Sequence, residues 1–512
     1  MALVSGLGGR LEGGAGGCVV TGISTDSRRT RRGDLFVALP GGRVHGAAFV
    51  EEARRRGAVA AVLPTDAPAP GGFPVYRHPD PAALLPELAA RFYGHPGEEL
   101  LLAGVTGTNG KTTTALLLAH LLRAGGRRVA AWTTTAAWAP GGDFRPLWTT
   151  PPAHELQRWL RQAVDAGFRG AVLEVSSHGV AQRRIAGLRF AAGVATNLSP
   201  DHLDFHGSFE AYAAAKRAFI TALEPDAVAV LNGEDPVVRS FAAASRAHVV
   251  TFGFADGAGL RAEGVETGGS GSRFLLRVAD PELAARAGVV AGEGLAVRLA
   301  LVGLHNVANA LAASAAALWL GVPPERLAEA LGTFAAPPRR LESLRVGPFT
   351  VVNDVAMNEA SCETVLRAVA ALSPPQLVVV HAVRGHRGRE VNAGMARVLA
   401  RWNRRLGFAP LVVSLSLDRL ARYSVDHRPR EEEVEALRRA AEAGGLPLSL
   451  HASLEEAIAE AVDRLRPGGL LLLLGTFGMD DGPSLAVERL AARLGLPAPP
   501  APRYPLPEAE QG

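Results

Sequence analysis

A glycine-rich segment after an apolar run is the strongest chemical signal in the sequence. Residues 104–113 read Gly-Val-Thr-Gly-Thr-Asn-Gly-Lys-Thr-Thr and directly follow the apolar run 100–103. Between a strand and a helix, glycines let backbone N–H groups face phosphate oxygens, and the helix N-terminus adds positive potential. Lys111 would neutralise phosphate charge, and the Thr112 hydroxyl would hold Mg²⁺. The segment predicts a phosphate-binding loop, although Val105 stands where the standard spacing has glycine, and a turn without a ligand remains the alternative.

The lysines are a second signal, because there are so few of them. Only Lys111 and Lys216 are lysine among the 54 basic residues, and all the others are arginine. A site that needs an amine able to become neutral, or a compact ammonium, cannot accept a guanidinium in its place. Lys216 falls on an alanine-rich helix expected over residues 209–223. An exposed helix lysine is the alternative, but the retained amine favours a special role.

Two polar clusters follow apolar strands. Glu174 closes the strand expected at 170–175, and residues 196–207, which hold two Asp and two His, follow the next strand. Open α/β sheets bind ligands at the carboxyl ends of their strands. Glu174 is therefore a candidate Mg²⁺ ligand, and the Asp and His side chains suit metal or phosphate contacts. A solvated carboxylate and an ordinary polar loop remain the alternatives.

The elements that must position these residues alternate between strand and helix. Apolar strands expected at 128–134, 170–175 and 193–198 are interleaved with helices, which predicts a central, doubly wound parallel sheet that carries the phosphate loop. Residues 264–272 are rich in Gly and Ser and are expected to be a loop, and a helix is expected at 306–320.

Smaller α/β units flank the central sheet. Before it, strands at 34–39 and 59–63 surround a helix at 47–56, and after it residues 335–338 form a hinge. Beyond the hinge, strands are expected at 350–353, 376–381, 411–415 and 470–474. The fold class is therefore α/β in three domains, at 1–98, 99–336 and 337–512, of which the last is a C-terminal α/β domain.

Composition excludes several classes of protein. The 512 residues are 48% hydrophobic and 20% charged, and no charge-free apolar stretch reaches the roughly 18 residues of a membrane span. No export signal is recognisable, so we expect a cytoplasmic protein. Cys18 and Cys362 lie too far apart for a disulfide framework. Because the arginines are scattered among acidic residues, we expect no nucleic-acid partner. We further expect a monomer whose partners are small molecules.

Taken together, Lys111, Glu174, His202 and Lys216 resemble the pattern of the Mur ligases, most closely the E-type members of that family. The resemblance implies that these four are catalytic residues and that Mg²⁺ is held by Thr112, Glu174, His202 and carbamylated Lys216. Carbamate formation needs a neutral amine that attacks CO₂, which explains in physical terms why arginine would not serve.

The resemblance also implies the substrates and their contacts. It implies an ATP-dependent, ADP-forming ligase that joins an amino acid to UDP-N-acetylmuramoyl-L-Ala-D-Glu through an acyl phosphate, in peptidoglycan precursor synthesis. The implied ATP contacts are Gly107, Thr108, Asn109, Gly110, Lys111, Thr112, Thr113, Asn306, Arg340 and Asp354. The implied contacts of the UDP-sugar dipeptide are Ser27, Arg28, Thr149, Thr150, Ser176, Gln182 and Arg184.

The C-terminal third departs from the family pattern. Met357 occupies a position where the family has His, Arg387 is the counterpart of an arginine in a Gly-Asp-Arg-Asp segment, and no Asp-Asn-Pro segment is found. Two alternatives therefore stay open. One is a related ligase that acts on a different carboxylate and amine, and the other is a nucleotide-binding regulator that does not ligate.

Overall fold

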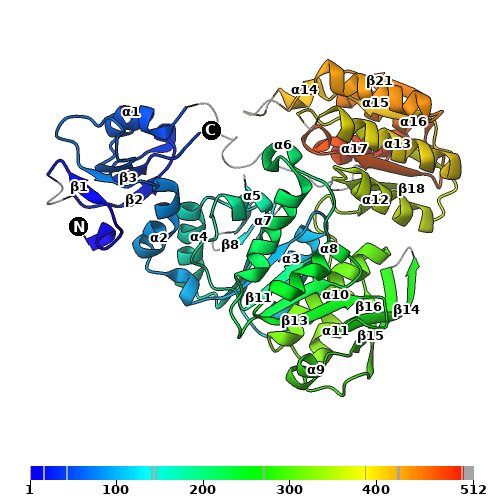
Figure 1. The fold of residues 1–512 in the computed structure, drawn as a ribbon. Coiled ribbons are helices and arrows are strands. Elements are labelled where there is room, and N and C mark those ends of the chain that lie inside the picture. The colour runs from blue at the N-terminus through cyan, green and yellow to red at the C-terminus, as the bar shows by residue number, and fades with distance from the viewer. Residues whose placement is uncertain are drawn as a thin grey trace.

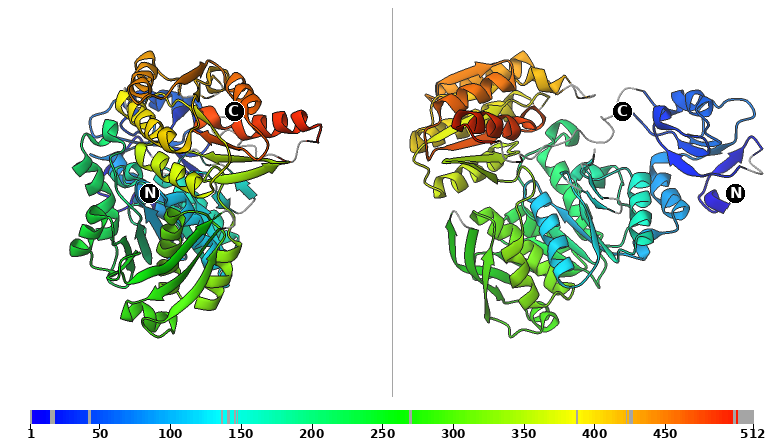
Figure 2. Two further views of the ribbon diagram at one scale, coloured as in Figure 1. Left: turned by 90° about the vertical axis from the view of Figure 1, so that its right-hand side faces the viewer. Right: turned by 180° about the vertical axis from the view of Figure 1, so that it is seen from behind.

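The computed structural model describes residues 2–14, 18–41, 44–135, 137–139, 142–144, 146, 148–268, 271–386, 388–421, 423, 427–497 and 500. These residues form three separate β-sheets that follow one another along the chain. In Figure 1 the blue N-terminal part and the yellow-to-red C-terminal part lie on different sides of the cyan-to-green middle part, and Figure 2 shows the same arrangement from behind. The fold is therefore α/β with three sheets, as predicted.

The N-terminal sheet has the order β1-β5-β4-β3-β2 and is parallel except for the pair β1 and β5. Two separate apolar clusters cover its faces, in line with strands that are buried on both sides. Its elements are β1 (Arg10–Glu12), β2 (Gly22–Ser24), β3 (Asp34–Val37), α1 (Val50–Arg55), β4 (Ala60–Leu63), β5 (Val75–Arg77) and α2 (Pro81–Phe92). The strands predicted at 34–39 and 59–63 are confirmed as β3 and β4.

The middle sheet has eleven strands among the described residues, in the order β16-β15-β14-β13-β12-β11-β6-β10-β7-β8-β9. Its centre, from β14 to β7, is parallel as predicted, whereas both margins continue with antiparallel strands. Its strands are β6 (Leu101–Thr106), β7 (Val129–Trp132), β8 (Ala137–Ala139), β9 (Gly142–Phe144), β10 (Gly170–Glu174), β11 (Ala192–Ala195), β12 (Val228–Asn232), β13 (His248–Gly253), β14 (Leu260–Gly268), β15 (Gly271–Val278) and β16 (Gly294–Leu299).

The prediction of a loop at 264–272 is wrong, because most of this segment belongs to β14 and β15. Along β15 the side chains of Ser272, Phe274, Leu276 and Val278 are buried and alternate with more exposed ones. That period of two is the signature of a strand with one face on the core. Within the segment, Gly268 and Gly271 pair with each other at the ends of the two strands.

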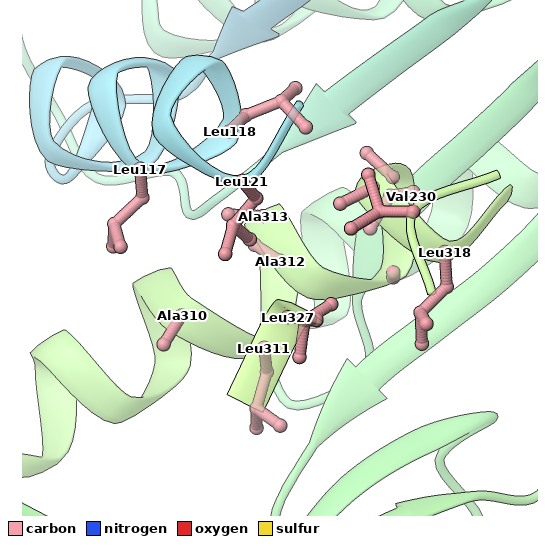
Figure 3. Packing of buried hydrophobic residues seen from close by; sticks show 14 of the residues in the cluster. Leu117, Leu118, Leu121, Val230, Ala310, Leu311, Ala312, Ala313, Leu318 and Leu327 are labelled. Atoms are coloured by element: carbon pink, nitrogen blue, oxygen red, sulfur yellow. The ribbon is translucent and has the colours of Figure 1, made fainter. Parts of the chain in front are cut away.

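Helices cover both faces of the middle sheet. They are α3 (Lys111–Ala124), α4 (Ala153–Asp165), α5 (Ser177–Ala181), α6 (Leu203–His206), α7 (Phe209–Thr221), α8 (Pro236–Ser240), α9 (Pro281–Ala287), α10 (Leu304–Trp319) and α11 (Pro324–Thr333). The residues of α10 from Ala310 to Trp319 are all buried, as expected for a helix that is apolar all round. Figure 3 shows Leu117, Leu118 and Leu121 of α3 next to alanines of α10 in this core.

The C-terminal sheet has the order β17-β18-β22-β19-β20-β21, and only β17 is antiparallel to its neighbour. β22 consists of five buried leucines, which is typical of a strand covered on both faces. The elements are β17 (Glu342–Val346), β18 (Phe349–Asp354), α12 (Glu359–Ala371), β19 (Leu377–Ala382), α13 (Arg389–Leu406), β20 (Leu411–Ser414), α14 (Leu417–Leu420), α15 (Glu431–Ala443), β21 (Leu448–His451), α16 (Leu454–Arg464), β22 (Leu470–Leu474) and α17 (Gly482–Leu494).

The order of the middle sheet brings the chemical segments together. β6 lies between β10 and β11, and Val105 is in register with Glu174 on one side and Val194 on the other. Because all three strands are parallel, the segments that follow them leave the sheet at the same edge. In the part of the chain that the structure describes, no helix is long and apolar enough to cross a lipid bilayer.

Candidate functional site

The glycine-rich loop joins β6 to α3, as the sequence predicts. Gly107 and Gly110 have φ angles of +140° and +83°, where L side chains are strained. A Cβ on Gly107 would lie 2.0 Å from Thr196 Oγ1, and one on Gly110 would lie 2.4 Å from Asn309 Oδ1. The loop therefore needs glycine at both positions for its conformation and for the close approach of its neighbours.

The segment after β11 holds the loop from one side. The backbone N–H of Thr108 donates to the carbonyl oxygen of Asn197 at 2.7 Å, and the N–H of Asn109 donates to Asn197 Oδ1 at 2.9 Å. Thr108 Oγ1 in turn lies 3.0 Å from the hydroxyl of Tyr212 on α7. Asn197 and Tyr212 were not among the predicted site residues, although each lies within a few residues of one.

Both lysines of the chain converge on the loop. Lys111 Nζ donates to the carbonyl oxygens of Gly107 at 3.1 Å and Thr108 at 2.9 Å. Lys216 Nζ reaches across from α7 and donates to the same oxygen of Gly107 at 2.7 Å. Burial lowers the pKa of Lys111, and burial together with the nearby Lys111 charge lowers the pKa of Lys216 far below its ordinary value. The structure thus joins two residues that are far apart in sequence, and Lys216 is not an exposed helix lysine.

The carboxylate of Glu174 is hydrogen-bonded to the first turn of α3. Thr112 Oγ1 donates to Glu174 Oε2 at 2.9 Å, and the same oxygen accepts the backbone N–H of Thr134 at 2.9 Å and its hydroxyl at 3.0 Å. Only 2% of Glu174 is exposed, so it is not a solvated carboxylate. Arg340, from the segment that precedes the C-terminal sheet, donates from Nη2 to Thr112 Oγ1 at 3.3 Å.

These oxygens fit the requirements of Mg²⁺. The ion prefers hard oxygen ligands and is commonly held by one or two protein groups together with phosphate oxygens and water. The Thr112 hydroxyl and the Glu174 carboxylate, 2.9 Å apart, supply such a pair at the start of α3. Among the described residues, no group of three or more His, Cys, Asp or Glu side chains is arranged to hold a metal ion.

His202 lies in a ring cluster beside the loop. Its imidazole is 4.7 Å from that of His178 and 6.4 Å from the Tyr212 ring, measured between centroids, and its Nε2 is 3.8 Å from Asp201 Oδ2. The structure therefore places His202 beside Tyr212 of α7, whose hydroxyl lies next to Thr108 of the phosphate loop. Its predicted part in a metal site remains a prediction.

The other predicted ATP residues surround α3. Asn306 Nδ2 donates to Val302 O at 2.9 Å, and its Oδ1 accepts from Asn309 Nδ2 at 3.2 Å. Asn309 Oδ1 accepts from Thr114 Oγ1 at 3.2 Å, so α10 is bonded to α3. Burial lowers the pKa of Arg340 and raises that of Asp354, and each charge partly offsets the shift of the other. Asp354 also accepts the backbone N–H groups of two residues, Leu341 and Ala356, at 2.8 Å each.

Most of the predicted dipeptide contacts form one hydrogen-bonded group. Thr150 Oγ1 lies 3.0 Å from Ser176 Oγ and donates to the backbone oxygen of Glu174 at 2.8 Å. Arg184 donates from Nη1 to Thr150 O at 2.6 Å and from Nε to Gln182 Oε1 at 3.0 Å. Thr149 Oγ1 lies 2.9 Å from the hydroxyl of Thr134, whose own bonds reach Glu174. This group is therefore continuous with the Thr112 and Glu174 pair.

The two predicted residues of the N-terminal sheet lie apart from this group. Ser27 Oγ donates to Glu52 Oε2 at 2.7 Å. Arg28 donates to both carboxylate oxygens of Asp26, at 3.0 and 2.7 Å, with 78% of its side chain exposed. Such an exposed guanidinium beside the N-terminus of a short helical turn remains accessible to an anionic ligand.

The C-terminal part also contacts the phosphate loop through Asn358, a residue that the sequence did not single out. Asn358 Nδ2 donates to Asn109 Oδ1 at 3.4 Å, and its neighbour Met357 is contacted at Sδ by the guanidinium of Arg384. Met357 thus packs against a cation where the resemblance has a histidine. Arg387 lies outside the described residues.

Family comparisons cover nearly the whole chain. Residues 19–93 match the family description "Mur ligase family, catalytic domain", residues 105–317 match "Mur ligase middle domain", and residues 339–477 match "Mur ligase, glutamate ligase domain". The chain is 35% identical over 463 residues to the UDP-N-acetylmuramoyl-L-alanyl-D-glutamate--2,6-diaminopimelate ligase of Gloeobacter violaceus, covering 89% of this chain and 88% of that one. It is 35% identical over 483 residues to the enzyme of the same name from Streptomyces avermitilis, covering 91% and 89%.

Solved structures agree with these matches. A structure of a UDP-N-acetylmuramoyl-L-alanyl-D-glutamate--2,6-diaminopimelate ligase superposes with a TM-score of 0.60 at 25% identity and covers 90% of each chain. The MurF ligase of Thermotoga maritima in complex with ADP gives a TM-score of 0.66 at 19% identity, with 93% of this chain and 99% of that chain covered, and supports the fold.

Proposed function

The chain belongs to the Mur ligase family, and from that premise we propose that it is an ATP-dependent, ADP-forming ligase. Its reaction joins an amino acid to UDP-N-acetylmuramoyl-L-Ala-D-Glu during peptidoglycan precursor synthesis, in keeping with the names of its relatives. The observation that carries this proposal is the meeting of both lysine amines at Gly107 O, beside the bonded pair of Thr112 and Glu174. A phosphate loop alone would not require the second buried amine.

The reaction proceeds in two steps. A carboxylate oxygen of the dipeptide attacks the γ-phosphorus of ATP, the bond to the β-phosphate oxygen breaks, and ADP leaves. The amine nitrogen then attacks the carbonyl carbon of the acyl phosphate, and the tetrahedral intermediate expels phosphate as the nitrogen loses a proton. No side chain of the enzyme forms a bond to substrate, so catalysis rests on positioning the reactants and neutralising their charge.

The residues of the loop have distinct roles in this proposal. Lys111 neutralises charge on the β- and γ-phosphates, and the backbone N–H groups at the start of α3 face the phosphate oxygens. Thr112, Glu174 and His202, with carbamylated Lys216, would hold Mg²⁺, which would neutralise phosphate charge. Asn306, Arg340 and Asp354 complete the ATP contacts.

The surroundings of Lys216 support its carbamylation. The neutral amine attacks the carbon of CO₂, a C–N bond forms, and one proton is released, so a neutral side chain becomes an anion. Burial beside Lys111 favours the neutral amine that this step requires. The product would bring an additional oxygen ligand towards the Thr112 and Glu174 pair.

The predicted substrate contacts, domain boundaries, location and oligomeric state belong to the same proposal. Ser27 and Arg28 contact the UDP group, and the dipeptide lies against Thr149, Thr150, Ser176, Gln182 and Arg184. The domains span 1–98, 99–336 and 337–512, which three separate sheets and three family matches support. The enzyme works as a cytoplasmic monomer, and the linker at 335–338 allows the domains to close on their substrates.

The test is phosphate release from ATP and Mg²⁺ with UDP-N-acetylmuramoyl-L-Ala-D-Glu and single amino acids, among them meso-diaminopimelate and L-lysine. The proposal expects release that depends on both the nucleotide sugar and one amino acid. Release without dependence on the nucleotide sugar would favour a ligase of another carboxylate. Nucleotide binding without release would favour the regulator.

A further inference from the structure

A buried ion pair fastens the segment between the middle and C-terminal sheets to the loop that follows β22. Arg339 lies between α11 and β17, and Asp480 lies just beyond β22. Their side chains are 5% and 0% exposed. Arg339 Nη1 donates to Asp480 Oδ1, and its Nη2 donates to the backbone oxygens of Gly475 and, at 3.2 Å, Thr476. The guanidinium is thus held by three oxygens of one loop.

Tyr423 completes the arrangement. Its hydroxyl donates to Asp480 Oδ2 at 2.6 Å, so both oxygens of the buried carboxylate accept a hydrogen bond. A charge-assisted pair of this kind is costly to break from one side, because the remaining charge stays buried. We call Arg339, Asp480 and Tyr423 the linker lock.

Arg340, the residue after Arg339, reaches towards the phosphate loop. Arg340 donates from Nη2 to Thr112 Oγ1 of the phosphate loop at 3.3 Å. The backbone on either side is left-handed, with φ of +58° at Arg339 and +51° at Leu341, which is uncommon for residues other than glycine. Such backbone persists only where its surroundings hold it, and here Glu342 and Asp354 accept the N–H groups of Arg339 and Leu341 at 3.1 and 2.8 Å.

We propose that the linker lock sets the position of Arg340 on the phosphate loop, and that Arg339 is therefore a positioning residue for ATP. The two arginines are adjacent in the chain, so a rotation of the segment that frees the first side chain also displaces the second. The lock holds the Arg339 end fixed to the C-terminal sheet while Arg340 reaches the middle sheet. This inference rests on the proposed function only in assigning ATP to the phosphate loop.

A double-mutant cycle tests it. The variants Arg339→Met, Arg340→Met and the double substitution are compared by the KM for ATP, the KM for the nucleotide sugar, and the Kd of a fluorescent ATP analogue. We expect Arg339→Met to raise the KM for ATP and the Kd of the ATP analogue about tenfold and to leave the KM for the nucleotide sugar unchanged. Because Arg339 acts through Arg340, the double variant should bind ATP no more weakly than Arg340→Met alone.

Two further variants keep the test decisive if Arg339→Met does not fold. Tyr423→Phe removes only one hydroxyl and should raise the KM for ATP and the Kd of the analogue about two- to threefold. Asp480→Asn should have an effect between those of Tyr423→Phe and Arg339→Met. Arg438→Met, which breaks exposed ion pairs on α15, is the matched control and should change nothing. Two outcomes would overturn the linker lock. One is that the effects of Arg339→Met and Arg340→Met multiply in the double variant, and the other is a lower kcat with an unchanged KM for ATP and an unchanged Kd of the analogue.

The same measurements separate the inference from the proposed function. If the unmodified protein releases no phosphate in the presence of the nucleotide sugar and amino acids, the proposed function fails. The Kd of the ATP analogue still reports on the lock in that case, because binding needs no ligation. An unchanged Kd in Tyr423→Phe and Asp480→Asn overturns the lock whether or not the protein is a ligase.

Discussion

The carboxyl edges of the middle and C-terminal sheets use buried charge in opposite ways. At the middle edge, two lysine amines share the Gly107 oxygen and Lys111 also donates to the Thr108 oxygen, an arrangement that suits Lys111 to receiving phosphate. At the C-terminal edge, Arg339 and Asp480 neutralise each other inside the protein. A buried ammonium that donates to backbone carbonyl oxygens, as Lys111 does, can receive an anionic ligand, whereas a guanidinium bonded to its counter-ion supports the structure. The contrast separates residues expected to touch substrate from those expected to position others.

The sharpest test of that contrast is Lys111. Replacing it with Met removes the ammonium from the phosphate loop, and we expect kcat/KM to fall about 10³-fold, equivalent to about 4 kcal/mol of transition-state stabilisation. Lys111→Arg should recover little, because the amine lies within 3.1 Å of two loop oxygens and a guanidinium does not fit the same position. Phosphate-release kinetics measure both. A loss smaller than tenfold for Lys111→Met would show that the middle edge does not depend on this charge.

The second test is Lys216, whose role at the middle edge requires an anion rather than a cation. We expect Lys216→Ala to lose about 10²-fold in kcat, a cost of about 2.7 kcal/mol, because an oxygen ligand near Thr112 and Glu174 is missing. Formate or acetate should restore part of the activity of Lys216→Ala but none of Lys216→Arg. ¹³C NMR of the unmodified protein in labelled bicarbonate should show a carbamate signal. Full activity of Lys216→Arg would refute the carbamate.

The difference between the two edges also explains what the sequence predicts and what it does not. Gly107, Lys111 and Glu174 stand at recognisable places, after apolar strands and within a glycine-rich loop, and the parallel order of the sheet then brings them together. The pair of Arg339 and Asp480 spans 141 residues and leaves no local pattern. Local composition also misled at 264–272, where glycine and serine suggested a loop but the alternating burial of β15 decides for strand. Long-range side-chain pairing is what a single sequence leaves open.

The third test compares one buried histidine from each region. Burial lowers the pKa of His154 on α4 and of His381 on β19 to about 4, below the 6.5 of an unfolded chain. Between about pH 4 and 6.5 the unfolded state therefore binds more protons than the folded state. The stability that comes from the neutral buried histidine is fully present above about pH 6.5 and is lost as the pH falls towards 4. From pH 7 to 5.5 each histidine should cost about 1 kcal/mol of unfolding free energy.

Urea unfolding at the two pH values measures this loss in His154→Leu and His381→Leu. In each variant the unfolding free energy should depend less steeply on pH than in the unmodified protein. The double variant should combine the two changes, because His154 lies on α4 beside the middle sheet and His381 lies in the C-terminal sheet. An unaltered pH dependence in His381→Leu would show that the histidine is not held neutral at the C-terminal edge.

The smallest expected effect concerns Asn358, where the two edges meet. Its side chain caps α12 by accepting the N–H of Ser361 at 2.9 Å, and its amide nitrogen donates to Asn109 of the phosphate loop at 3.4 Å. Asn358→Ala should cost about 1 kcal/mol of stability through the lost cap. It should also lower kcat a few-fold, since the long contact to Asn109 is weak. Asn358→Asp keeps the cap and isolates the contact, because a carboxylate cannot donate to Asn109.

Ser453→Ala provides the matched control for this last effect. Ser453 caps α16, a helix of the same C-terminal domain, by accepting the N–H of Glu456 at 3.1 Å. Its cap bond therefore tests capping without the contact to Asn109. Both Ala variants should unfold at lower urea concentration by similar amounts, yet only Asn358→Ala and Asn358→Asp should lower kcat. Equal kcat in all three would mean that capping is the whole role of Asn358. In that case the hydrogen bond from Arg340 to Thr112 would couple the two edges, and the linker lock would be what positions the C-terminal sheet on the phosphate loop.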